Sequence, residues 1–516
     1  MVYLVYGWVG GKGPIMKVMK NNSDDFLTVP NNQYEKFFFN SENDKLSYIW
    51  DDWFFTNVTF ANYPPSTSGN KNTYILEGTS LNNCKWGIQS WQITNNNRFL
   101  EPIGLIGRFF NGPYVPFSDS RYINDDGWSR LVRLSAPQNL SQGAVSFSMV
   151  SGDFLAQVSG YTGAPHLMTV NQISTNFNYS GWAIRLGSGS GPASDDLPPD
   201  TSRVVTMIWD LPSGPEPMSS PNGGAVTGDV AMDISNTRAV LARKTCKVSS
   251  NDQRHMIFDS DWSPVKCVMF GETGNINPGT ELFIPNTTDF PLNENMLLDA
   301  FFKSDNQGVF QRPPNYAREI GTSANCQVDY KVEPGGIRLR CNGTFGFALR
   351  YMLYSAGPDD YTTGGSRVMR ELPNGHIQFK RPGSSDVAPN YNDILLDTRI
   401  PTVQILDEAW VPLSSFSHGN THRIPYDDRN GSMFIFPKII TDFGNIRRSG
   451  MDFGYLRSVT VSGVQITVKD RSIQSCLTSI QNGYVDATVN TTRAENDGSA
   501  LNGPTGIRYY ILGVPK

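Results

Sequence analysis

Two histidines are the first side chains whose type and spacing could support chemistry. His418 and His422 are four positions apart, the spacing that places two zinc ligands on one face of a helix. The surrounding sequence, Ser-His-Gly-Asn-Thr-His, is typical of a turn, and no third ligand accompanies it. The glycine-rich segment 187–200 matches neither a dinucleotide fingerprint nor a phosphate loop. We therefore predict no metal site and no bound cofactor.

Pairs of adjacent aspartates recur along the chain and could in principle serve hydrolysis or calcium binding. Two carboxylates at a suitable separation cleave glycosidic bonds, and clustered carboxylates bind calcium. Adjacent residues of a strand point to opposite faces, so one such pair cannot form either site alone. Turn positions next to Gly or Asn explain them better. No GxSxG elbow is present, so we predict a protein that is not an enzyme and assign no catalytic residue. The pairs are Asp24-Asp25, Asp51-Asp52, Asp125-Asp126, Asp195-Asp196, Asp359-Asp360 and Asp427-Asp428.

Aromatic side chains are concentrated in the first part of the chain, which contains seven of the ten tryptophans. One interpretation is additional core, since large aromatic residues are usually well buried. The other is a docking or sugar-stacking surface. Its candidate residues are Trp53, Phe54, Phe55, Trp86 and Trp91.

Length and composition favour several β domains. A chain of 516 residues exceeds what one hydrophobic core usually serves. Charged residues make up only 18%, and the chain contains 48 Gly and 33 Pro, which favours short strands joined by turns over long helices. The net charge of −5 gives no basic footprint, so we expect no nucleic-acid partner.

Nothing in the sequence indicates membrane insertion or a disulfide framework. No run approaches the ~18 consecutive apolar residues of a membrane helix. Residues 1–9 lack a basic leader and a cleavage site, so we predict a first strand there and not a signal peptide. Six cysteines in so long a chain indicate buried thiols, although Cys326 and Cys341 could face each other across a hairpin.

One sequence pattern occurs three times, in residues 15–49, 230–268 and 376–405. Each copy has a strand-like run, a polar loop, a second run ending in a polar tripeptide and, a few residues later, a third run. Each unit then closes with an apolar, arginine-bearing strand, and the closing strands are expected at 202–209, 347–354 and 507–512. Short alternating runs bounded by Gly, Pro and Asn predict half-buried antiparallel strands.

The predicted fold is mostly β, with three tandem antiparallel β-sandwich-like domains, of which the first is enlarged by an insertion. We place the domain boundaries in stretches rich in Gly, Ser and Pro, the composition of loops and linkers. We predict an N-terminal domain over 1–215, a linker over 216–227, a middle domain over 228–356, a linker over 357–366 and a C-terminal domain over 367–516.

Three stretches resemble modules of the structural proteins of tailed bacteriophages. They are Phe39-Asn40-Ser41-Glu42, Phe258-Asp259-Ser260-Asp261-Trp262 with Val265-Lys266, and the closing Arg508-Tyr509-Tyr510-Ile511-Leu512. The third copy departs most, because Leu396-Asp397-Thr398-Arg399 replaces the aromatic and the acidic positions. The resemblance implies a tail-tip, tail-fibre or minor virion protein, assembled in the host bacterial cytoplasm as a homo-oligomer. Its implied partners are other virion proteins and a host surface glycan or outer-membrane receptor.

Two alternatives remain open at this point. A carbohydrate-active, polysaccharide-degrading enzyme with appended β modules would have the same composition. So would a collar or capsid decoration protein, which would differ in what it binds.

Overall fold

The computed structural model describes residues 3–49, 232–355, 361–442 and 447–516, each with short gaps, and strand segments between residues 54 and 212. The described residues are almost all strands and turns, without an α-helix, and short 3-10 turns such as Tyr34–Lys36, Pro373–Gly375 and Leu413–Ser415 interrupt them. The prediction of a mostly β protein is confirmed. Within the described part, no helix is long and apolar enough to cross a membrane.

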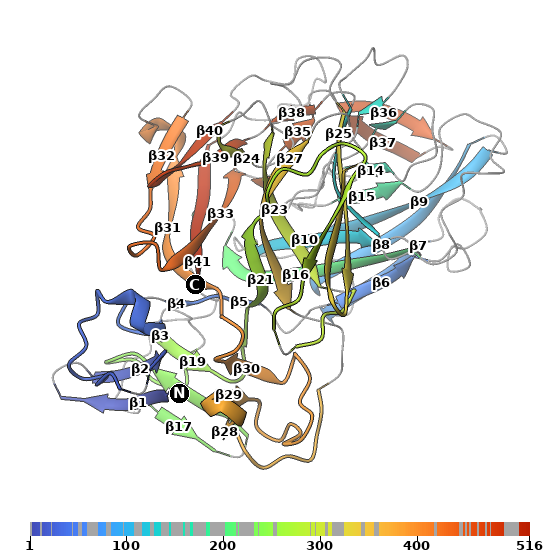
Figure 1. Cartoon of the computed structure of the whole chain (residues 1–516). Helices are drawn as coiled ribbons and strands as arrows, with labels where there is room; N and C mark the ends of the chain where they lie inside the picture. The colour runs from blue at the N-terminus through green and yellow to red at the C-terminus, as the bar shows by residue number, and fades with distance from the viewer. Residues whose placement is uncertain are drawn as a thin grey trace.

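Three small antiparallel sheets lie together at one end of the molecule (Figure 1). We call these nine strands the lower body. One shared core joins the three sheets, with Val18 and Phe39 from the first, Leu241 and Phe258 from the second and Phe379 from the third. The strands are β1 (Tyr3–Val9), β2 (Gly13–Met19) and β3 (Phe37–Asn40); β17 (Met232–Ile234), β18 (Ala239–Ala242) and β19 (Met256–Asp259); and β28 (Met369–Glu371), β29 (Ile377–Lys380) and β30 (Ile394–Asp397).

Three larger antiparallel sheets make up most of the remaining, upper part of the molecule (Figure 1). The nine-stranded sheet runs β20 (Ser263–Pro264), β5 (Tyr48–Ile49), β16 (Ser202–Pro212), β10 (Pro116–Ile123), β11 (Ser129–Ser135), β25 (Asn325–Glu333), β26 (Gly336–Cys341) and β22 (Glu281–Pro285), with β6 (Phe54–Val58) also on β16. The seven-stranded sheet runs β21 (Lys266–Glu272), β27 (Phe347–Ser355), β23 (Leu297–Ser304), β24 (Phe310–Gln311), β39 (Cys476–Gln481), β40 (Tyr484–Val489) and β32 (Thr421–Pro425). The five-stranded sheet runs β34 (Arg447–Arg448), β33 (Met433–Asp442), β41 (Gly506–Pro515), β31 (Gln404–Pro412) and β4 (Lys45–Leu46).

The remaining described strands form four further sheets, and none of the described sheets closes on itself. One has five strands, in the order β14 (His166–Met168), β15 (Trp182–Arg185), β9 (Arg98–Gly107), β8 (Cys84–Asn95) and β7 (Lys71–Gly78). The two-stranded sheets are β12 (Ala144–Val145) with β13 (Val158–Ser159), β35 (Met451–Phe453) with β38 (Ser472–Gln474), and β36 (Leu456–Val461) with β37 (Val464–Lys469).

Strand pairing connects segments that are far apart in the sequence. β11 pairs with β25, β24 pairs with β39, and β31 pairs with β4. Each of the three large sheets therefore combines strands from two of the predicted domains. The domain boundaries themselves stay a prediction, because residues 216–231 and 356–360 lie outside the described residues.

Two apolar cores lie between strands of different large sheets. In the first, Leu298 and Leu349 of the seven-stranded sheet pack with Ile337 and Leu339 of β26. In the second, Ile435, Ile507 and Ile511 of the five-stranded sheet pack with Ile424, Val485 and Ala487 of β32 and β40. Burying one such aliphatic side chain stabilises the fold by about 1.5–3 kcal/mol. The alternating burial along β40 shows one face turned to this core and the other outward.

Candidate functional site

The three polar tripeptides of the sequence pattern have the same local structure, and we call residues 40–42, 259–261 and 397–399 the polar turns. In each, the middle hydroxyl accepts a hydrogen bond from a backbone N–H of the neighbouring strand. These pairs are Ser41 Oγ with Met16 N at 2.9 Å, Ser260 Oγ with Ala239 N at 2.8 Å, and Thr398 Oγ1 with Ile377 N at 3.0 Å. The three hydroxyls therefore stabilise the ends of three equivalent strand pairs.

The first side chain of each polar turn also plays one role three times. The side-chain Oδ1 of Asn40, Asp259 and Asp397 accepts the backbone N–H two residues later, at 3.0, 3.0 and 2.9 Å. This is the Asx turn that Asn and Asp favour. The third copy makes these contacts although its sequence departs most, because the backbone needs only an Asx residue followed by a hydroxyl.

The charged partners of the polar turns differ from copy to copy. Lys17 Nζ lies 2.9 Å from Glu42 Oε2 in the first. Arg238 binds Asp259 in the second, where burial raises the pKa of Asp259 and the hydrogen bond from Arg238 opposes that rise. In the third, Arg399 binds Asp397 at 2.8 Å.

The three strand runs that follow the polar turns meet in a closed ring of backbone hydrogen bonds, which we call the strand junction. Ser47 N donates to Val403 O at 2.9 Å, Val403 N to Val265 O at 2.7 Å, and Val265 N to Ser47 O at 2.8 Å. Each segment gives one bond and receives one. The junction therefore arranges the three segments around a common axis.

A buried lysine lies directly beside the strand junction. Lys266 Nζ donates to Ile394 O at 2.7 Å, and its side chain is almost wholly buried. Burial is the main cause that lowers the pKa of Lys266 to about 7; nearby Arg381 acts in the same direction, while Asp397 and Asp393 oppose it.

A buried ion pair lies next to the junction, beside a core that contains Trp209, Tyr354, Val265 and Val403, and we call its surroundings the central core. Lys438 Nζ is 2.9 Å from Asp299 Oδ2, and both side chains are 0% exposed. The Lys438 ammonium also lies over the Trp209 ring, 4.6 Å from its centroid, and near Tyr354. Asp299 comes from β23, Lys438 from β33 and Trp209 from β16, so three distant segments supply this site.

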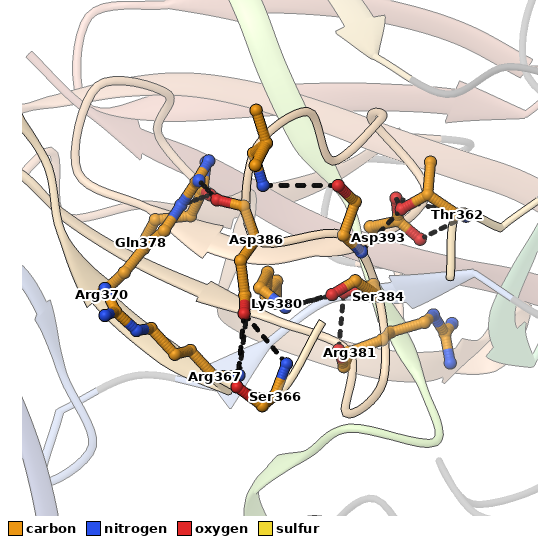
Figure 2. A network of polar contacts seen from close by, with 12 residues as sticks. Thr362, Ser366, Arg367, Arg370, Gln378, Lys380, Arg381, Ser384, Asp386 and Asp393 are labelled. Carbon is orange, nitrogen blue, oxygen red and sulfur yellow. Dashed lines mark hydrogen bonds and ion pairs between the residues drawn. The ribbon is translucent and has the colours of Figure 1, made fainter. Parts of the chain in front are cut away.

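The third small sheet carries a polar network in its long loop, residues 381–393 (Figure 2). Asp386 accepts the backbone N–H groups of Ser366 and Arg367, at 2.9 and 3.1 Å, and pairs with Lys380 at 2.9 Å. The Ser366 hydrogen bond and Lys380 hold the pKa of Asp386 well below its usual range. Asp393 binds Thr362 in the same way. These carboxylates are occupied by backbone and lysine donors, so the network fixes the loop.

The four predicted surface aromatics that the structure describes lie in two different sheets. Phe54 and Phe55 lie in β6, which pairs with β16, whereas Trp86 and Trp91 lie in β8 of the five-stranded sheet that begins with β14. Trp53 lies outside the described residues. The proposed docking or sugar-stacking role of these residues stays a prediction.

Of the two candidate zinc-binding histidines, the structure describes one. His418 lies outside the described residues, and His422 lies in β32, where burial lowers its pKa. No group of three His, Cys, Asp or Glu in the described part could hold a metal ion. Cys267 and Cys341 are buried thiols, as expected, and the register of β25 and β26 places Val328, not Cys326, opposite Cys341.

Sequence reasoning missed the buried lysines. Lys17, Lys266 and Lys438 are almost wholly buried, whereas lysine is usually exposed. A usable signal was present for Lys438, which interrupts the apolar run from Met433 to Ile440.

Comparisons with known proteins add no relative. No family model, no curated protein and no solved structure matches this chain.

Proposed function

We propose that the chain is a tailed-bacteriophage virion structural protein, a tail-tip or tail-fibre subunit that takes part in assembling the host-attachment apparatus. The observation that carries the proposal is the strand junction, in which Ser47, Val265 and Val403 place three similar segments around one axis. A component of a symmetric tail has to present rigid, repeated surfaces around such an axis. Repeated β units provide them without requiring a catalytic cavity.

The finer fold proposed here is three β-sandwich-like units joined through shared sheets, the first enlarged. Two observations support it. The core around Leu349 and Leu339 lies between two sheets of the middle segment, and the core around Ile511 and Val485 lies between two sheets of the last. Each unit extends a sheet of the next, which would resist the mechanical load of attachment.

Self-association is proposed through the outer edges of the lower body. β1, β17 and β28 are the end strands of their sheets, and an end strand offers unpaired backbone groups to a second copy. Met232 in β17 and Met369 in β28 are both about half exposed. The other proposed partners are virion proteins and a host surface glycan or outer-membrane receptor, and the proposed location is the virion.

The position of the protein in intact particles tests the proposal. Gold-labelled antibodies viewed by electron microscopy should bind at the tail tip or fibre base. Label on the capsid shell would instead support a decoration protein. Release of sugars from a host polysaccharide by the purified chain would support the enzyme and contradict our proposal.

Self-association is tested separately by size-exclusion chromatography with light scattering. We expect particles that are multiples of the 57.2 kDa chain. The double variant Met232→Asp with Met369→Asp should dissociate them, because charge at a sheet edge opposes pairing. Val387→Asp, at an exposed loop position of the lower body, is the matched control and should leave them intact. A wild-type monomer at high concentration would contradict this part.

A further inference from the structure

Lys17 occupies an unusual position for a lysine. Its side chain is 1% exposed and lies in β2, whose residues are all buried. Its ammonium has three oxygen partners: Asn31 Oδ1 at 2.8 Å, Glu42 Oε2 at 2.9 Å and Phe26 O at 3.3 Å. An amine nucleophile, a carboxamide and a carboxylate therefore meet at one buried point.

The Asn31 side chain is held with its carbonyl toward the amine. Asn40 Oδ1 accepts the Glu42 backbone N–H, which turns Asn40 Nδ2 toward Asn31 Oδ1 at 3.1 Å. Because Lys17 Nζ and Asn40 Nδ2 are both donors, the Asn31 atom between them is the oxygen. Asn43 Nδ2 also donates to the Asn31 backbone oxygen at 2.8 Å, which fixes the loop at this residue.

We propose that Lys17 and Asn31 form an intramolecular isopeptide bond. Glu42 accepts a proton from the Lys17 ammonium, and the neutral Nζ attacks Asn31 Cγ. Asn40 Nδ2 donates to the Asn31 oxygen as negative charge develops there. Glu42 then returns the proton to the departing nitrogen, so that the Cγ–Nδ2 bond breaks and ammonia leaves, and the Glu42 carboxylate takes the second proton from Nζ. The ammonium and the carboxamide become one secondary amide, one ammonia and one proton, with no oxidant or cofactor.

The comparison with Lys438 shows why the first site is the reactive one. Lys438 is equally buried, but its ammonium pairs with a carboxylate, that of Asp299. An ionised carboxylate resists attack by an amine, whereas a carboxamide polarised by a second donor accepts it. The bond would tie β2 to the loop 20–36, which has only turns and the short 3-10 segment Tyr34–Lys36.

Tryptic peptide mapping of the purified, denatured full-length chain tests the proposal. We expect peptides 13–20 and 21–36 to appear as one joined species, uncleaved after Lys17, and lighter than their sum by one ammonia, about 17 Da. Cleavage after Lys17 that gives peptides 13–17, 18–20 and 21–36 at their unmodified masses would overturn the proposal.

Two variants identify the roles of the groups. Glu42→Gln keeps the side-chain shape but removes the proton acceptor, so the two peptides should separate while circular dichroism stays that of a folded β protein. Lys36→Gln is the matched control, because Lys36 pairs with Asp24 in the same loop. Its Lys17–Asn31 cross-link should persist and join peptides 13–20 and 21–45, because trypsin no longer cleaves after residue 36. A joined species in Glu42→Gln would refute the assigned role of Glu42.

Discussion

The polar turns and the central core handle buried charge in opposite ways. At the turns, the same backbone hydrogen bonds occur three times, while the charged partner changes from Lys17 to Arg238 to Arg399. In the central core, one ion pair between Lys438 and Asp299 lies among aromatic rings, away from water. Because backbone hydrogen bonds fix the turns, different charged side chains can occupy them. In the dry core, either charge without the other would be buried and unpaired.

The largest effect is expected at the central core. Lys438→Met leaves the Asp299 carboxylate buried without its cation and should lower the free energy of unfolding by about 3–5 kcal/mol. Urea denaturation followed by tryptophan fluorescence measures it. The double variant Lys438→Met with Asp299→Leu should recover most of that loss, because it removes the unpaired charge. If Lys438→Met is as stable as the wild type, the central core tolerates an unpaired buried carboxylate.

A pH-dependent effect of a few kcal/mol is expected at Lys266, between the two regions. Its pKa is about 7 in the folded protein, against 10.5 for the unperturbed group. Between these pH values the unfolded chain carries the proton and the folded chain does not, so Lys266 makes stability rise with pH. Below pH 7 Lys266 is protonated in both states, so stability no longer changes with pH through this group and is at its lowest.

Lys266→Met should reduce that slope and raise stability most at pH 7 and below. Urea midpoints measured from pH 6 to 10 on both proteins check this. Parallel curves for the variant and the wild type would contradict the expectation.

A smaller and uniform effect is expected at the polar turns. Ser41→Ala, Ser260→Ala and Thr398→Val each remove an acceptor for a buried backbone N–H and should cost about 1–3 kcal/mol. Chemical denaturation of the three single variants compares them directly. If the largest loss in unfolding free energy is more than twice the smallest, the three turns are not equivalent.

The smallest effect is expected at an exposed pair, Arg423 with Asp486 in β32 and β40. Water and salt screen exposed pairs, so Arg423→Ala should change the unfolding midpoint little, and less still in high salt. If Arg423→Ala lowers the free energy of unfolding as much as Lys438→Met does, the contrast between buried and exposed ion pairs is wrong.

The β character could be predicted because it depends on local patterns. Alternation in short runs such as Ile337–Arg340, with turns rich in Gly and Asn, indicates strands directly. The polar turns were visible for the same reason, since an Asx residue followed by a hydroxyl is a local signal.

Strand partners and the fate of buried charges were not predictable in this way. The pairing of Arg130 with Asp329 depends on register across some two hundred positions, which no local pattern encodes. Lys17 interrupts the apolar run from Ile15 to Met19, but the run does not indicate what its ammonium binds. Only the loop that supplies Asn31 shows why it is buried.

The pairing of β4 with β31 has a consequence for how the molecule is made. Gln404 bonds across to Leu46, so a strand that leaves the ribosome early has its neighbour only after most of the polypeptide has been synthesised. Contacts of such wide sequence separation form slowly, and unfilled sheet margins invite aggregation in the meantime. Nascent chains should therefore depend on chaperones until the last segment emerges.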